Sequence, residues 1–212
     1  KEMAEKHEFM LKVDTSTTRG LAQALAKGVF NEGVSLFASF VMLLNFQRRG
    51  LMMGMCKIVE WSIKDETKHV EGVSRLFRTV CEEHPRIVTE KFKREIYDMA
   101  RRIVELEDAF IDLAYANHTI EGLSKEDVKL YIRYIMDRRL IMLGLKGNYG
   151  VKINPIPWLD WIISATNHTN FFEGKVAEYE VAGLQGGINY DDMMVFTIFS
   201  KDGCPYCQKA KE

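Results

Sequence analysis

Two carboxylates and one imidazole in this chain have the types and spacing of metal ligands. Glu32 lies inside an otherwise apolar run, residues 28–37, and Glu66 is followed three residues later by His69. Di-iron and di-manganese carboxylate bundles use one glutamate from each of two helices and one Glu-x-x-His pair from each of two others. The sequence supplies one of each, which predicts half of a dinuclear site. Oxygen and imidazole ligands without thiolate favour iron or manganese.

Two long helices are expected to position these side chains. Residues 20–46 carry a nearly continuous apolar surface, which is typical of a buried helix. The sequence Gln-Arg-Arg-Gly at 47–50 interrupts it. A second helical pattern runs over 51–83 and ends before Pro85.

The distances along these helices predict that the three candidate ligands meet. Glu32 lies 14 residues before Phe46, and Glu66 lies 15 residues after Leu51. At 1.5 Å per residue, each is roughly 21–23 Å from the turn. A short connection makes the helices antiparallel neighbours, so both positions reach the same level of the hairpin. His69 shares a face with Glu66, because residues three apart on a helix are neighbours.

The flanking residues favour a buried site over a surface ion pair. The same helix faces carry mostly apolar side chains, namely Leu36, Ser39, Phe40, Val59, Ile63, Val70 and Val73. An ionised carboxylate is costly there unless it is paired or bound to metal. The alternative is an ordinary surface pair, which is the common meaning of a single Glu-x-x-His. Glu32, within its apolar run, is harder to explain in that way.

Further helices are expected after Pro85. A helix is expected over 87–117, where apolar residues recur in steps of four and three, namely Phe92, Ile96, Met99, Ile103, Leu106, Phe110 and Leu113. A capping box at Ser124 opens a helix over 125–143, which Gly144 closes. Residues 154–158 form a proline-containing rigid turn, and 158–166 a short helix.

Composition excludes several classes of protein. The chain has 212 residues and a net charge of −1, so nothing indicates a binder of nucleic acid or of anionic membranes. No transmembrane helix and no signal peptide is expected. The chain starts at Lys1, as if within a longer protein. Cys56 and Cys81 fit small core residues, and the absence of a disulfide framework favours the reducing cytoplasm.

Several motifs together resemble the small, radical-generating (beta) subunit of class I ribonucleotide reductase. The likeness covers about residues 15–185 in the family's order. It is carried by Asn31-Glu32-Gly33, Ser39-Phe40, Lys64-Asp65-Glu66-Thr67-Lys68-His69, Asp137-Arg138-Arg139-Leu140, Leu143-Gly144-Leu145, Asn154-Pro155-Ile156-Pro157-Trp158, Asn170-Phe171-Phe172-Glu173 and Glu178-Tyr179. The resemblance implies an all-α, ferritin-like helical bundle that is partial, with the first two ligand-bearing helices missing.

The resemblance also implies roles for single residues. Glu32, Glu66 and His69 match three of the family's six metal ligands. Asp65 matches the aspartate that joins the metal site to the long-range radical path, and its alternative is an ordinary surface aspartate. The implied cofactor is a di-iron, manganese–iron or di-manganese centre, completed by ligands from outside this chain.

Further positions of the likeness concern the pocket and the tail. Tyr179 matches the tail tyrosine that relays the radical to the large subunit, and Glu173 the acidic residue ahead of it. Ser39 and Phe40 match positions that line the metal and radical pocket. Leu36 departs from the pattern, since many members carry an aromatic residue there.

The end of the chain resembles a second family. After a Gly-rich linker, the strand-like segment 195–199 precedes Cys204-Pro-Tyr-Cys207, which is similar to the first strand and active-site turn of glutaredoxin. Cys204 would be the attacking thiolate and Cys207 the resolving thiol. Half of a zinc site is the alternative.

The expected organisation has three parts. Residues 1–182 form the helical domain, 183–194 a flexible linker, and 195–212 a truncated strand-turn-helix start of a thioredoxin-like domain. The implied function is initiation of ribonucleotide reduction together with the large (alpha) subunit, as a homodimer of beta subunits, with a separate N-terminal beta fragment as a further partner. The alternatives are another ferritin-like di-iron oxidase, a metal-binding helical module without chemistry, and a simple thiol oxidoreductase.

Overall fold

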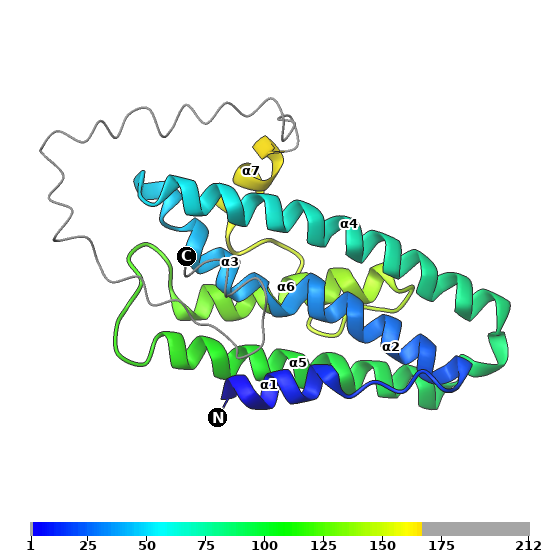
Figure 1. The fold of residues 1–212 in the computed structure, drawn as a ribbon. Helices are drawn as coiled ribbons and strands as arrows, with labels where there is room; N and C mark the ends of the chain where they lie inside the picture. The colour runs from blue at the N-terminus through cyan, green and yellow to red at the C-terminus, as the bar shows by residue number, and fades with distance from the viewer. Residues whose placement is uncertain (1, 167–212) are drawn as a thin grey trace, which may run out of the picture. The chain divides into compact units, whose positions relative to one another are not determined.

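The computed structural model describes residues 2–166, and within that range it contains helices and turns but no strand (Figure 1). The all-α prediction is therefore confirmed for this part of the chain. The elements are α1 (Glu2–Leu11), α2 (Thr18–Phe30), the π-helix η1 (Asn31–Ser35), α3 (Phe37–Leu44), the short 3-10 helix η2 (Gln47–Arg49), α4 (Met53–Glu83), the 3-10 helix η3 (Pro85–Ile87), α5 (Glu90–Ala114), α6 (Lys125–Met142) and α7 (Pro157–Thr166).

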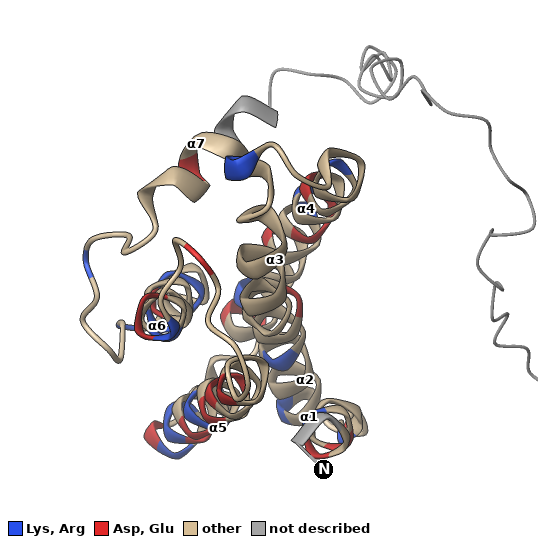
Figure 2. Ribbon diagram, turned by 90° about the vertical axis from the view of Figure 1, so that its left-hand side faces the viewer, with Lys and Arg blue, Asp and Glu red and all other residues tan. Residues whose placement is uncertain are grey.

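The segments α2, η1 and α3 follow one another as the central rod of the bundle. Seen almost along its axis, the rod lies among α1, α4, α5 and α6 (Figure 2). Small and aliphatic residues make this possible, because they let four neighbours approach closely. The fully buried ones are Ala22, Ala26, Val29, Val34, Ala38, Val41 and Leu44, and the aromatic Phe30 is buried with them. The predicted buried helix over 20–46 is confirmed, but the π-helical interruption was not predicted.

The central rod also meets a simple length and hydropathy criterion for crossing a membrane. Residues Thr18–Arg49 reach a mean hydropathy of 1.5, and 56% of the most apolar window is buried inside the protein. Core helices pass the same test. Because the apolar side chains of this rod form the core of the bundle, we interpret it as a core helix.

The turn between α3 and α4 lies at residues 47–50, where the sequence predicts the interruption. Gly50 adopts a left-handed conformation (φ 66°), and the N–H of Leu51 donates to the carbonyl of Phe46 at 3.0 Å. Met52 is also left-handed, which moves the start of α4 to Met53, two residues later than predicted. The helix ends at Glu83, before Pro85, as predicted.

Side-chain caps set the ends of α5 and α6. The hydroxyl of Thr89 accepts from the N–H of Phe92, so α5 starts at Glu90 and is shorter than the predicted 87–117. Ser124 caps α6 as predicted, and Gly144 is left-handed (φ 78°) after its end. One expected core position of α5 is wrong: Leu113 is 52% exposed, since the helix ends one residue later.

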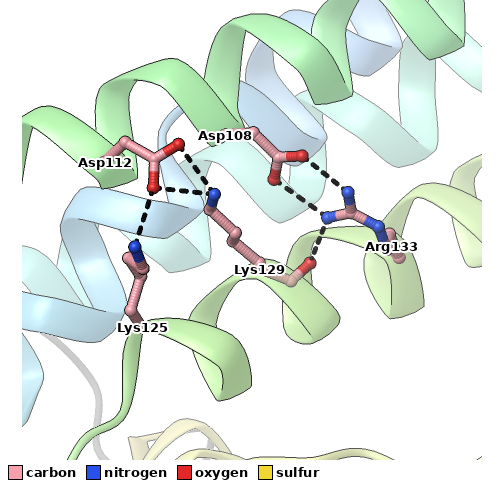
Figure 3. Close-up of polar contacts among 5 residues, drawn as sticks. All are labelled: Asp108, Asp112, Lys125, Lys129 and Arg133. Carbon is pink, nitrogen blue, oxygen red and sulfur yellow. Dashed lines mark hydrogen bonds and ion pairs between the residues drawn. The ribbon is translucent and has the colours of Figure 1, made fainter.

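Ion pairs join α5 to α6 along their outer edge (Figure 3). Both oxygens of Asp108 accept from the guanidinium of Arg133, at 2.9 and 2.6 Å. Asp112 pairs with Lys125 at 3.2 Å and with Lys129 at 2.8 Å. These groups are partly exposed, so each pair adds little stability.

A buried carboxylate organises the loop after α6. The oxygens of Asp137 accept from the backbone N–H groups of Asn148 (2.6 Å), Tyr149 (2.9 Å) and Val151 (3.3 Å). Three such bonds compensate for burying the charge. The loop leads to Asn154, whose side chain accepts from a backbone N–H as the predicted rigid turn requires, and then to α7.

The first helix, α1, was not predicted, and it lies beside α5 (Figure 1). Its carboxyl end is capped from another helix, since the ammonium of Lys27 on α2 donates to the carbonyls of Phe9 and Lys12. Of the two cysteines assigned to the core, Cys56 is buried and Cys81 half-buried, and both are free thiols.

Candidate metal site

The three predicted ligands come together between η1 and α4. The imidazole Nδ1 of His69 lies 3.9 Å from Oε2 of Glu32 and 3.6 Å from Oε2 of Glu66. One donor atom from each of the three lies within 4.8 Å of the others. The expected level-matching of the hairpin is therefore confirmed. The role of these residues as ligands stays a prediction.

The two carboxylates need a positive partner. Oε2 of Glu32 and Oε2 of Glu66 are both buried and accept no hydrogen bond among the described residues. They are also the oxygens that face His69, at distances too long for a hydrogen bond. Burial raises the pKa of Glu32, the charge of Glu66 raises it further, and His69 opposes the shift. Buried, unpaired carboxylates are unfavourable unless something neutralises them.

A single divalent ion fits this geometry. Metal–ligand bonds of about 2.0–2.2 Å place two ligands of one ion roughly 3–4.4 Å apart, and the distances from Nδ1 of His69 to the two carboxylates fall in this range. Two carboxylates and one imidazole suit iron or manganese. The described residues hold one group of this kind.

The prediction of a buried site is wrong for the side on which His69 lies. The side chain of Glu32 is 33% exposed, that of Glu66 22%, and that of His69 60%. The neighbouring residues Ile63 and Val70 on α4 are buried, so the apolar surroundings that the sequence predicted are present on the inner side of the cluster. No described helix covers the outer face of the cluster, which explains the exposure of the imidazole.

The backbone that carries Glu32 is a π-helix, which the sequence analysis missed. Such one-turn insertions into α-helices are frequent at functional sites, because the extra residue turns a side chain out of the regular register. A Cβ at Gly33 would lie only 2.6 Å from Nε of Arg139, a residue of α6 that donates to the Gly33 carbonyl at 3.1 Å. A glycine next to a candidate ligand was the available signal for this close approach.

The remaining predicted site residues lie apart from the three ligands or outside the described range. Asp65 is exposed and lines a hollow of about 590 Å³ along α4, to which Ile163 of α7 also contributes. Ser39 and Phe40 are half-buried on α3, and the ring of Phe40 packs edge-on against Phe37 with centroids 5.7 Å apart. Their roles stay predictions.

The predictions for the tail cannot be compared with the structure. The radical-transfer residues Glu173 and Tyr179, the linker, and the redox pair Cys204 and Cys207 all lie outside the described residues.

The fold and the site together define a class of protein: a ferritin-like helical bundle in which paired helices bring carboxylates and an imidazole to one point. The family profile described as "Ribonucleotide reductase, small chain" matches residues 1–155. The chain therefore belongs to the ribonucleotide reductase small-chain family.

Individual relatives agree with this assignment. The chain is 43% identical over 205 residues to "Probable ribonucleoside-diphosphate reductase small subunit 048L" of Invertebrate iridescent virus 3, covering 88% of this chain and 54% of the relative. It is 33% identical over 159 residues to the "Ribonucleoside-diphosphate reductase subunit beta" of Chlamydia pneumoniae, covering 73% of this chain and 44% of that protein. The chain thus spans about half the length of these curated relatives.

Solved structures show the same fold. A crystal structure from Bacillus halodurans, described as class I ribonucleotide reductase, superimposes with a TM-score of 0.72 at 23% identity, covering 76% of this chain and 59% of that one. The "Ribonucleotide reductase R2 subunit from Clostridium botulinum" gives a TM-score of 0.63 at 27% identity, with coverages of 66% and 44%.

Proposed function

We propose that this chain provides half of the di-metal centre of a ribonucleotide reductase small subunit. The observation that carries the proposal is the pair of buried, unpartnered carboxylate oxygens of Glu32 and Glu66 beside His69, on two helices packed side by side. Family membership supports it. The remaining ligands would come from polypeptide outside this chain, and they would cover the open side of the cluster.

Each of the three residues has a distinct task in this proposal. Glu32 and Glu66 hold the cation and cancel its charge, and His69 adds a neutral nitrogen ligand. When bound, the two iron or manganese ions would supply the oxidising equivalent that starts the reduction of ribonucleotides to deoxyribonucleotides. The buried Ile63 and Val70 lie beside these glutamates, and Oε2 of each glutamate is shielded from water, which strengthens its attraction to a cation.

The resemblance extends the proposal to other residues. Asp65, Glu173 and Tyr179 would carry the radical toward the large subunit, and Ser39 and Phe40 would line the pocket. Asp65 is suitably placed for contact with an added helix, since it is exposed on α4.

Three further parts of the proposal concern the whole protein. The large (alpha) subunit would be the partner that binds ribonucleotides, and the small subunit would form a homodimer in the cytoplasm. The segment with Cys204 and Cys207 would be the start of a glutaredoxin-like domain. Such a fusion is chemically apt, because each turnover of a ribonucleotide reductase leaves a disulfide to be reduced.

Metal titration tests the proposal. Mn²⁺ is added to the purified 212-residue chain, and the free ion is followed by electron paramagnetic resonance. We expect one bound Mn²⁺ per chain, lost in Glu66→Ala and retained in Glu71→Ala, which changes an exposed glutamate further along α4. Equal binding by wild type and Glu66→Ala would refute the assignment.

A co-expression experiment tests the second half of the centre. The partner is the part of the iridescent virus 3 relative that this chain does not match. The proposal expects the purified complex to hold two metal ions per chain. A stable complex that still holds one ion would contradict it.

A further inference from the structure

Two cationic side chains from outside the α2–α4 hairpin donate to the backbone of the π-helix η1. The ammonium of Lys6, on α1, donates to the carbonyl of Ser35 at 2.6 Å. Nε of Arg139, on α6, donates to the carbonyl of Gly33 at 3.1 Å. Both carbonyls lie within the η1 turn, just after Glu32 in the sequence, and they are contacted from two different helices.

Lys6 is itself held by a carboxylate in the core. Its ammonium lies 2.5 Å from Oε1 of Glu107 on α5, and the side chain of Glu107 is fully buried. This contact is an ion pair, and neither oxygen of Glu107 has a hydrogen-bond partner among the described residues. Burial raises the pKa of Glu107 to about 7, against the opposing effect of Lys6.

A buried ion pair of this kind is not explained by stability. Replacing such a pair by apolar residues of similar volume is often neutral or stabilising, because both ions lose their hydration when buried. The pair does accomplish something that apolar residues would not: it delivers a charged donor to the Ser35 carbonyl.

The guanidinium of Arg139 also contacts two side chains, Phe37 and Met142. Its guanidinium lies 5.8 Å from the ring centroid of Phe37, and its Nη1 lies 3.4 Å from the sulfur of Met142. Desolvation lowers the pKa of Arg139, although the group stays charged. Gly33 leaves the space that the guanidinium occupies.

We propose that Lys6, held by Glu107, and Arg139 are positioning residues that fix the η1 turn so that Glu32 faces Glu66 and His69. This inference rests on the proposed metal site. Partners that orient a ligand typically change metal affinity about 10–100-fold when they are removed. The two cations act on the backbone of η1, so their removal loosens the turn without altering a ligand.

The test uses the whole chain and a double variant, Lys6→Met with Glu107→Leu. The double variant removes the donor to Ser35 without leaving a buried charge, so the fold is retained. We expect the Kd for Mn²⁺ to rise about tenfold and the amides of residues 32–36 to exchange hydrogen faster. A purely structural role for the pair predicts wild-type affinity and exchange in the double variant, which would overturn the proposal.

Two matched controls separate positioning from general loosening. Lys27→Met removes another buried lysine. Lys27 is on α2 and donates to backbone carbonyls at the carboxyl end of α1. Arg133→Met removes an arginine of α6 that pairs with α5, and it is compared with Arg139→Met. We expect Arg139→Met to weaken Mn²⁺ binding and the two controls to retain it. Equal losses in the controls would contradict the proposal.

The outcomes also separate this inference from the proposed function. If the wild-type chain binds no Mn²⁺, the metal site fails, and amide exchange in residues 32–36 alone decides whether the two cations fix η1. If the wild type binds Mn²⁺ and the Lys6 and Arg139 variants bind it equally well, the metal site stands and the positioning role fails.

Discussion

Two adjacent residues of α5, Glu107 and Asp108, form ion pairs in opposite surroundings. Glu107 points into the core and meets Lys6, with no exposure to solvent. Asp108 points toward α6 and forms a partly exposed, two-point pair with Arg133 (Figure 3). The carboxylate of Glu107 is thus shielded from water, whereas that of Asp108, one residue further along the helix, is partly hydrated. The consequences of breaking the two pairs should differ accordingly.

The largest effect is expected from breaking the buried pair on one side only. Lys6→Met leaves Glu107 buried without a partner, and such a change typically destabilises a protein by about 3–5 kcal/mol. Urea denaturation measures the free energy of unfolding. Adding Glu107→Leu should restore most of the loss. A double variant as unstable as the single one would show that the pair contributes more than charge compensation.

The buried carboxylate should also make stability depend on pH. The pKa of Glu107 is raised to about 7 in the folded protein, above its ordinary value of 4.5. The folded state therefore binds this proton more tightly, so the contribution of Glu107 to stability is fully present below its ordinary pKa of 4.5 and is lost as pH rises through about 7. By linkage the fall approaches about 3 kcal/mol. The difference between wild type and Glu107→Gln, followed from pH 5 to 8, isolates this term, and a flat difference would contradict it.

A smaller effect is expected where η1 meets Arg139. In Gly33→Ala the new Cβ would lie 2.6 Å from Nε of Arg139, so the guanidinium must move away from the carbonyl. We expect a loss of about 1–3 kcal/mol, as for other overpacked sites. Gly72→Ala, on α4, is the matched control: a Cβ there meets nothing within 4 Å, so it should stabilise the helix slightly. Thermal unfolding of the two variants should move in opposite directions.

The smallest effect is expected at the exposed end of the α5–α6 edge. Asp112 is 50% exposed and pairs with two lysines, Lys125 and Lys129. Asp112→Asn should cost less than about 1 kcal/mol, and salt should reduce the difference. A loss of stability in Asp112→Asn that persists in 1 M salt would contradict a screened surface ion pair.

The sequence predicted those features that local signals determine. Gly50, Pro85 and the Ser124 cap mark helix ends, and counting residues from the turn placed Glu32 level with Glu66. These depend on chain geometry within one helix or one hairpin, which is regular enough to calculate.

Other features depend on contacts that no local pattern records. The carbonyls of the π-helical turn η1 accept hydrogen bonds from Lys6 and Arg139, which are far away in the sequence. The exposure of His69 depends on which other helices cover the α2–α4 hairpin, and the sequence of the hairpin does not determine this. Both misses concern the surroundings of the candidate ligands, whereas their mutual approach was predicted.

The sharpest test of the metal site is anomalous X-ray diffraction at the manganese edge, on crystals of the 212-residue chain soaked in manganese chloride. We expect one strong peak at coordination distance from Glu32, Glu66 and His69. Ordered density for those three side chains with no peak between them, or with manganese bound only at other residues, would contradict it.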